Sequence, residues 1–148
     1  MQRRKFLGLG LSAVAFSTVA SANILKEHPE AFKAKSTEEA MKGLYGTSES
    51  MSDGKAKLKA PDIAENGAAV PVTVSTTLEN PKTMAITVDG NPHPLVAAWE
   101  VQPGTIPEFS TRIKMRKTAN VTLTVEDANG KLHTVTKQVK VTVGGCGG

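Results

Sequence analysis

The sequence predicts an all-β protein, an immunoglobulin-like antiparallel β-sandwich with a short N-terminal helical arm and a flexible C-terminal tail. From residue 55 onward apolar and polar residues alternate, in about seven short runs that Asn-Pro, Asp-Gly, Pro-Gly and Asn-Gly turns separate. Before residue 55, helix-start and helix-stop signals replace this alternation. The cysteine–tryptophan–cysteine pattern of true immunoglobulin domains is absent, so the prediction concerns architecture only.

A chain of 148 residues is long enough for one domain with a real core, and we find no internal repeat and no second domain. We divide it into a signal peptide (1–22), a helical arm and loop (23–54), a β-sandwich domain (55–143) and a flexible tail (144–148).

The first 22 residues have the pattern of an export signal. Arg3 and Arg4 precede Phe6-Leu7, and a short apolar run ends in the cleavage pattern Ala20-Ser21-Ala22. The paired arginines favour the twin-arginine pathway, and an ordinary Sec signal with two chance arginines is the alternative. The apolar run is too short for a stable membrane anchor. We therefore expect the mature protein in a bacterial periplasm.

The net charge of +4 belongs mostly to this signal. Removing its three basic residues from the total of 18 leaves 15, against 14 acidic ones. Only 4% of the residues are aromatic, which disfavours base stacking. We expect no binding to nucleic acid.

The helical arm carries its own start and stop signals. Pro29 suits a first helical turn, Ser36 with Glu39 forms a capping box, and Gly46 can end the second helix. This arm is expected to pack on the domain or on a partner.

The first predicted strands follow residue 55. Lys55, Lys57 and Lys59 alternate with apolar residues on a probable edge strand, where lysines protect against aggregation or, alternatively, form a docking patch. The next strand has its apolar face on Val70, Val72 and Val74, and Pro71 predicts an edge or the start of that strand.

The later strands follow the same rule. Apolar residues of these strands are Ile86 and Val88; those of 95–101, with Trp99 in the core; Phe109, Ile113 and Met115; Val121, Leu123 and Val125; and, after the Asn129-Gly130 hairpin, Val135, Val139, Val141 and Val143, interrupted by Lys137. The segment Arg112 to Lys117, with the sequence RIKMRK, is basic enough to attract an anion or an acidic partner, but its alternation also suits a solvated strand.

A search for an active site finds no complete one. His28, His93 and His133 lie far apart, we interpret them as surface or turn residues, and no metal-ligand spacing is present. No phosphate loop, nucleophile elbow or dinucleotide fingerprint occurs. We therefore predict no catalytic residue, no metal and no cofactor, and a protein that is not an enzyme.

The single cysteine, Cys146, has glycines on both sides, at positions 144, 145, 147 and 148. A lone thiol cannot form a disulfide within its own chain. It can project about 10 Å from the last strand on a thin arm, which suits a covalent carrier that presents an adduct to successive enzymes. The alternative is an exported structural subunit in which Cys146 makes a permanent intermolecular disulfide.

Several stretches resemble the SoxY family, the sulfur-carrying subunits of periplasmic thiosulfate oxidation. They are the GGCGG terminus, the twin-arginine start, APDIAENGAAVPVTV (60–74), GNPHPL (90–95) and TRIKM (111–115). The resemblance covers nearly the whole chain after the signal, and the glycine-flanked cysteine of an exported protein is its most specific element.

The resemblance implies an immunoglobulin-like sandwich that forms a heterodimer with a SoxZ-like subunit. It further implies that Cys146 accepts sulfur, with Gly144, Gly145, Gly147 and Gly148 as the flexible arm. A SoxXA-like enzyme would load thiosulfate, a SoxB-like enzyme would release sulfate and leave a persulfide, and a SoxCD-like enzyme, where present, would oxidise the remaining sulfur. The carrier itself would catalyse none of these steps.

Overall fold

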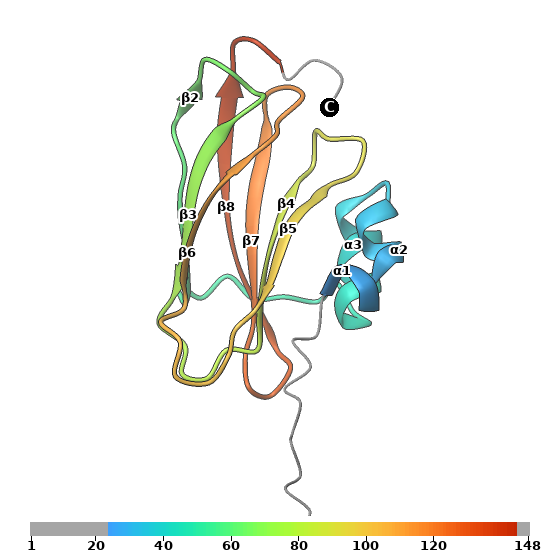
Figure 1. Cartoon of the computed structure of the whole chain (residues 1–148), viewed down its shortest axis with the longest axis vertical. Coiled ribbons are helices and arrows are strands. Elements are labelled where there is room, and N and C mark those ends of the chain that lie inside the picture. Colours follow the sequence, from blue (N-terminus) through green and yellow to red (C-terminus); the bar gives the residue numbers. More distant parts are fainter. Residues whose placement is uncertain (1–23, 145–148) are drawn as a thin grey trace, which may run out of the picture.

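The computed structural model describes residues 24–144, as three short helices followed by eight strands (Figure 1). The helices are α1 (Ile24–Glu27), α2 (Pro29–Lys33) and α3 (Thr37–Tyr45). The strands are β1 (Ala56–Lys59), β2 (Ile63–Ala64), β3 (Val70–Thr76), β4 (Thr83–Val88), β5 (Leu95–Glu100), β6 (Glu108–Ile113), β7 (Ala119–Glu126) and β8 (Leu132–Val141).

The strands form two sheets that pack face to face, which confirms the predicted immunoglobulin-like sandwich. One sheet has the order β1-β3-β6 and the other the order β2-β8-β7-β4-β5. All pairings are antiparallel except that of β2 with β8. The sequence analysis missed β2, because a strand of two residues is too short to show an alternation.

Alternation places the apolar residues of both sheets between them. Val72, Val74, Ile86, Leu123 and Val125 are each at most 2% exposed. Trp99 is partly buried and stacks on Phe109, with ring centroids 5.1 Å apart and an interplanar angle of 4°. The stack joins β5 to β6, which are the edge strands of the two sheets.

Pro71 lies in the middle strand of its sheet, so the edge interpretation of this residue is wrong and the strand-start interpretation is right. β1 pairs with β3 only over Thr73 to Thr76, so no strand lies beside Pro71 on the β1 side. The missing N–H of proline therefore costs no ladder hydrogen bond.

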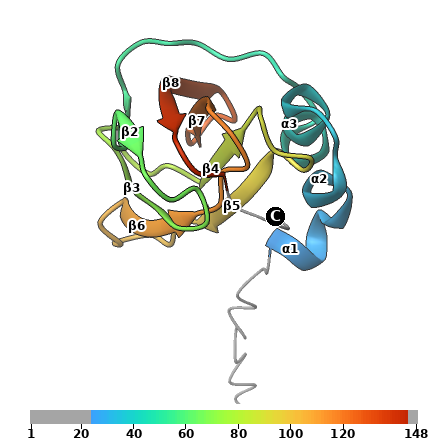
Figure 2. The same cartoon turned by 90° about the horizontal axis from the view of Figure 1, so that it is seen from above.

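The three helices pack beside β5, and the linker from α3 to β1 runs around the outside of the sandwich (Figure 2). The predicted caps are confirmed: Ser36 Oγ accepts from the backbone N–H of Glu39 at 3.1 Å, and Gly46 ends α3 with φ = 73°. Gly43 lets α3 approach α2 closely, because a Cβ at position 43 would lie only 3.1 Å from Ala31 of α2.

Strand β8 carries two polar residues, His133 and Lys137, on its inward-facing side. The Lys137 ammonium contacts the carbonyl oxygen of Ala60 at 2.5 Å and a carboxylate oxygen of Asp62 at 2.9 Å, which explains why it interrupts the valine pattern. β8 ends at Val141, so the prediction that Val143 belongs to the strand is wrong: its side chain is 61% exposed.

No helix among residues 24–144 is long and apolar enough to span a bilayer.

Candidate functional site

Most of the predicted site residues lie outside the described part of the chain. They are Arg3 and Arg4 of the export signal, and Gly145, Cys146, Gly147 and Gly148 of the tail. Gly144, the first residue of the tail, is described. The structure therefore shows where the tail leaves the domain, at the end of β8 (Figure 1).

Four hydrogen bonds hold the chain immediately before the tail. The backbone N–H of Val141 donates to Thr118 Oγ1 at 2.9 Å. The backbone N–H of Thr142 donates to the Ala64 carbonyl at 3.1 Å. Gly67 N–H donates to the Val143 carbonyl at 2.8 Å. The Thr142 hydroxyl donates to the Glu65 carbonyl at 3.4 Å. The polypeptide is thus fixed to the domain as far as Val143.

Gly144 continues this close packing. Its backbone lies so near the carbonyl oxygen of Arg116 that a Cβ at position 144 would overlap it. A side chain at this position therefore requires the tail or the Arg116 backbone to shift. Cys146 follows two residues later, a span of about 7 Å when the chain is extended.

The loop 89–94 lies beside this exit point. The Asn91 side chain bridges two backbone groups: its amide nitrogen donates to the Lys114 carbonyl at 2.7 Å, and its oxygen accepts from Arg116 N–H at 2.9 Å. His93 Nδ1 lies 3.2 Å from the carbonyl oxygen of Lys33 at the end of α2, so the same loop also contacts the helical arm.

Two open hollows flank this loop. One, of about 530 Å³, is lined by Asp89, Gly90, Asn91, Pro92, Arg116 and Lys117. The other, of about 180 Å³, is lined by Asn91, Pro92, His93, Val96, Lys114 and Arg116.

The basic segment singled out in the sequence supplies the cations of both hollows. Ile113 and Met115 point into the core, 3% and 0% exposed. The alternate residues Arg112, Lys114 and Arg116, and also Lys117, are exposed on the surface. We call these four residues the cationic ridge. The predicted strand alternation is confirmed, and the ridge runs from β6 to the exit point of the tail.

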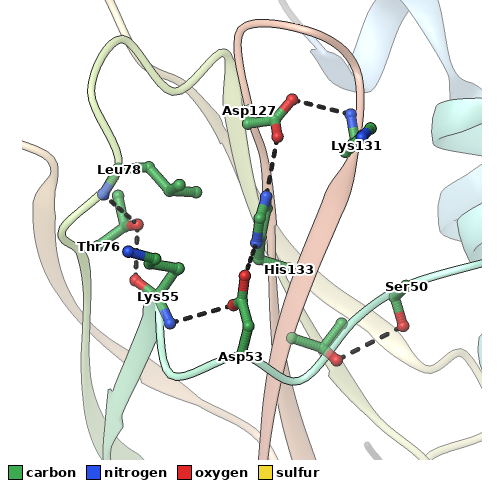
Figure 3. Close-up of polar contacts among 9 residues, drawn as sticks. Ser50, Asp53, Lys55, Thr76, Leu78, Asp127, Lys131 and His133 are labelled. Carbon is green, nitrogen blue, oxygen red and sulfur yellow. Dashed lines mark hydrogen bonds and ion pairs between the residues drawn. The ribbon is translucent and has the colours of Figure 1, made fainter.

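A second polar cluster, which the sequence analysis missed, lies on the inward-facing side of β8 (Figure 3). His133 Nδ1 is 2.8 Å from a carboxylate oxygen of Asp53, and Nε2 is 2.9 Å from one of Asp127. His133 is only 5% exposed, so its interpretation as a surface or turn residue is wrong. The three residues come from the linker, the β7–β8 hairpin and β8, and no local sequence signal connects them.

Both carboxylates favour the doubly protonated imidazole. The hydrogen bond to Asp127 raises the pKa of His133 against the opposing effect of burial, and that to Asp53 adds to it. The hydrogen bond from His133 lowers the pKa of Asp127. Burial works against ionisation of Asp53, but the His133 hydrogen bond and backbone donors outweigh it and lower its pKa. We call this cluster the histidine clasp.

The histidine clasp fastens the linker to the sandwich. Met51, two residues before Asp53, forms a parallel β-bridge with His133. In this bridge Met51 N–H donates to the Leu132 carbonyl at 2.9 Å, and Thr134 N–H donates to the Met51 carbonyl at 2.8 Å. Within residues 24–144 no group of three or more histidine, cysteine, aspartate or glutamate side chains is arranged to hold a metal ion. The contacts of His133 with Asp53 and Asp127, together with the Met51 bridge, join the linker to β8 and the hairpin, and in this sense the clasp is a structural fastening.

Residues 41–146 match the sequence model of the family described as sulfur oxidation protein SoxY, which is well over half of the chain. The matched region includes Cys146. No curated protein sequence is significantly similar to this chain.

Among solved structures, the sulfur carrier protein SoxY from Chlorobium limicola f thiosulfatophilum is similar, with 38% sequence identity and a TM-score of 0.66. The match covers 75% of this chain and 96% of that one. The superoxide reductase (neelaredoxin) of Ignicoccus hospitalis has a TM-score of 0.53 at 17% identity, covering 59% of this chain and 80% of that one. The superoxide reductase of Nanoarchaeum equitans has a TM-score of 0.51 at 10% identity, and the match covers 61% of this chain and 99% of that one. At these identities the reductases share only the fold.

Proposed function

The chain belongs to the SoxY family of sulfur oxidation proteins, and on this basis we propose that it is a thiosulfate oxidation carrier that holds sulfur covalently on Cys146. The observation that carries the proposal is the family match, because it extends through the domain to residue 146 itself. The protein is proposed to present the bound sulfur to periplasmic enzymes and to catalyse none of the steps.

The chemistry asks little of the carrier itself. An ordinary cysteine thiol, with a pKa near ~8.5, is a few per cent thiolate at neutral pH, which suffices for sulfur exchange. Glycines at 144, 145, 147 and 148 leave the thiol without bulky neighbours, so the arm can enter a narrow active site. Activation of the thiolate can then come from the enzyme that receives the arm.

We propose that loading and release are two separate reactions at Cys146. A SoxXA-like heme enzyme joins the Cys146 thiol to the sulfane sulfur of thiosulfate, releasing one proton and passing two electrons to its hemes. A SoxB-like hydrolase then adds water across the bond between sulfane and sulfone sulfur. Sulfate and a proton leave, and a persulfide stays on Cys146, a reversible cap of a kind that thiols carry. A SoxCD-like enzyme, where present, is proposed to oxidise that persulfide sulfur.

We further propose that a SoxZ-like subunit forms a heterodimer with this chain, and that the twin-arginine signal with Arg3 and Arg4 exports it to the periplasm. The Chlorobium relative is named as a sulfur carrier, which supports the carrier role. The described end of β8, fixed by hydrogen bonds just before the tail, supports an arm that moves while its root stays in place.

The test is the mass of the C-terminal peptide from protein isolated during thiosulfate oxidation. We expect Cys146 to carry adducts of sulfur or thiosulfate mass that a reductant removes. The variant Cys146→Ser should lose every adduct and all support of thiosulfate oxidation. Its Tm should stay within about 1 °C of wild type, because in the sequence residue 146 follows the last strand, which ends at Val141.

The alternative, a permanent intermolecular disulfide, predicts different results. Non-reducing gels would show one stable, stoichiometric disulfide-linked dimer, and Cys146→Ser would lose assembly. Only unmodified thiol during turnover, or such a dimer as the sole form, contradicts the carrier proposal.

A further inference from the structure

The cationic ridge (Arg112, Lys114, Arg116 and Lys117) has no neutralising partner among residues 24–144. In the part of the chain that the structure describes, none of its four side chains forms an ion pair. Other lysines do find acids: Lys42 contacts Glu38 at 2.7 Å and Lys137 contacts Asp62 at 2.9 Å. The ridge is therefore a local excess of positive charge on a mature chain with nearly balanced charges.

The carboxylate that lies in the same hollow is already engaged. Asp89 lines the larger hollow with Arg116 and Lys117, but both its oxygens accept hydrogen bonds from Asn120. The backbone N–H of Asn120 donates to one at 2.8 Å, and its side-chain amide donates to the other at 2.9 Å. These neutral donors hold Asp89 toward β7 but leave its negative charge in place, so the local charge stays positive because the ridge has four cations against this one carboxylate.

The backbone under the ridge is fixed by packing and hydrogen bonds. Ile113 and Met115 anchor it in the core, and the Asn91 side chain bonds both the Lys114 carbonyl and the Arg116 N–H. Gly90 fits closely against Ala119, where a Cβ would come within 2.7 Å of the alanine methyl. Charges on a fixed backbone make a preorganised electrostatic surface, which favours rapid and oriented encounter with an opposite charge.

The ridge ends where the tail begins. Gly144 packs against the Arg116 carbonyl, and the four residues that follow can extend about 14 Å beyond it. A protein held on the ridge would thus have Cys146 within reach without further search. The geometry points to the cationic ridge as a docking surface for the acidic rim of an enzyme active site that receives the arm. This inference rests on the proposed function.

The experiment measures loading of the carrier by the SoxXA-like enzyme of the same organism, with thiosulfate, as a function of carrier concentration and salt. The test variant is Arg112→Glu with Arg116→Glu. The control is Lys82→Glu with Lys131→Glu, which changes the net charge equally at exposed sites next to the ends of β4 and β8 that are remote from the tail.

At low salt we expect the ridge variant to raise the KM for the carrier about tenfold or more with kcat unchanged, since steering acts on encounter. Added salt should raise the KM of wild type and leave that of the ridge variant nearly constant. The control should stay within about twofold of wild type. The double variant Arg112→Gln with Arg116→Gln removes the charge but keeps side-chain polarity, and it should raise the KM by an intermediate amount. It replaces the glutamate double variant as the test if that variant folds poorly.

Equal KM values for the ridge and control variants would overturn the docking surface and make the ridge an ordinary solvated face. If the wild-type protein and the ridge variants are all loaded normally, the carrier function stands and only this inference is removed. Wild type that acquires no adduct contradicts the proposed function, and the docking surface falls with it.

Discussion

At the scale of single residues, His133 is an ionisable side chain that the fold buries, with 5% of it exposed. Each ring nitrogen has a carboxylate oxygen within 2.9 Å, and each carboxylate also accepts from backbone N–H groups, of Lys55 for Asp53 and of Asn129 and Lys131 for Asp127. The imidazolium form satisfies both contacts, whereas a neutral ring can donate to only one. The charge state of one residue therefore determines how firmly the linker is held.

The stability provided by the histidine clasp should depend on pH. The pKa of His133 is raised in the folded protein, so its contribution is complete below the ordinary value of 6.5 and is lost as the pH rises through the folded value. The pKa values of Asp53 and Asp127 are lowered, so their contribution is present above 3.8 and is lost on further acidification.

We expect His133→Gln to lower Tm by about 5 °C or more near pH 5, with a smaller difference at alkaline pH, where the wild-type ring is neutral. Thermal unfolding across the pH range measures this. His93→Gln is the matched control, because His93 is exposed and its ring nitrogen lies near carbonyl oxygens rather than carboxylates. A Tm difference for His133→Gln that does not change with pH contradicts the clasp.

At the scale of secondary-structure elements, α3 has hydrogen bonds at both ends, from side chains at its start and from backbone at its end. The Glu39 carboxylate accepts from Lys35 N–H at 3.0 Å while Ser36 accepts from Glu39 N–H, and Gly46 N–H donates to the Lys42 carbonyl at 2.8 Å. The helix packs its small residue Ala40 against a cluster with Ala31, Ala85 and Leu95. Small side chains on both sides allow the helices to lie close to the sheet.

Removing the N-cap should weaken the helical arm before the sandwich. We expect Ser36→Ala to destabilise α3 by about 1 kcal/mol, because the Glu39 N–H loses its acceptor. Hydrogen exchange of α3 amides should quicken accordingly, while exchange of β7 amides stays unchanged. The control is Ser52→Ala, an exposed serine outside the helices and strands. Equal exchange of α3 amides in both variants would show that Ser36 does not cap the helix.

At the scale of the whole molecule, the long strand β8 lies beside only short segments on its outer edge. Met51 and β2 each pair with a part of it, near His133 and near Lys140. Two inward-facing polar residues hold these covering segments: His133 binds Asp53 beside the first, and Lys137 binds Asp62 beside the second. A charge that points inward from an exposed edge is one way in which sandwiches avoid edge-to-edge association.

Replacing that inward charge should promote self-association. We expect Lys137→Val to increase the oligomeric fraction in sedimentation velocity, because the segment around Asp62 loses its anchor and uncovers the β8 edge. Lys140→Val makes the same chemical change on the same strand, but at an outward-facing, exposed position, and should remain monomeric or keep its normal assembly. A similar increase in both variants would attribute the effect to surface hydrophobicity instead.

Much of the fold could be predicted because its signals are local. The capping box at Ser36, the αL position at Gly46, the hairpin at Asn129-Gly130 and the valine alternation of β3 each involve residues within a few positions of one another. The physical causes, which are side-chain hydrogen bonds to nearby backbone, glycine at positive φ and the two-residue period of a strand, act at the same short range. The glycine-flanked Cys146 is likewise visible in the sequence alone.

Features that depend on sheet register could not be predicted in this way. His133 meets Asp53 across 80 residues and Lys137 meets Asp62 across 75, and nothing local indicates either pair. The basic segment was visible in the sequence, but its place beside Gly144 depends on how β6 and β8 end in space. Short-range chemistry thus specified the elements and the thiol, whereas their long-range packing decided which charges are neutralised and which are left exposed at the root of the arm.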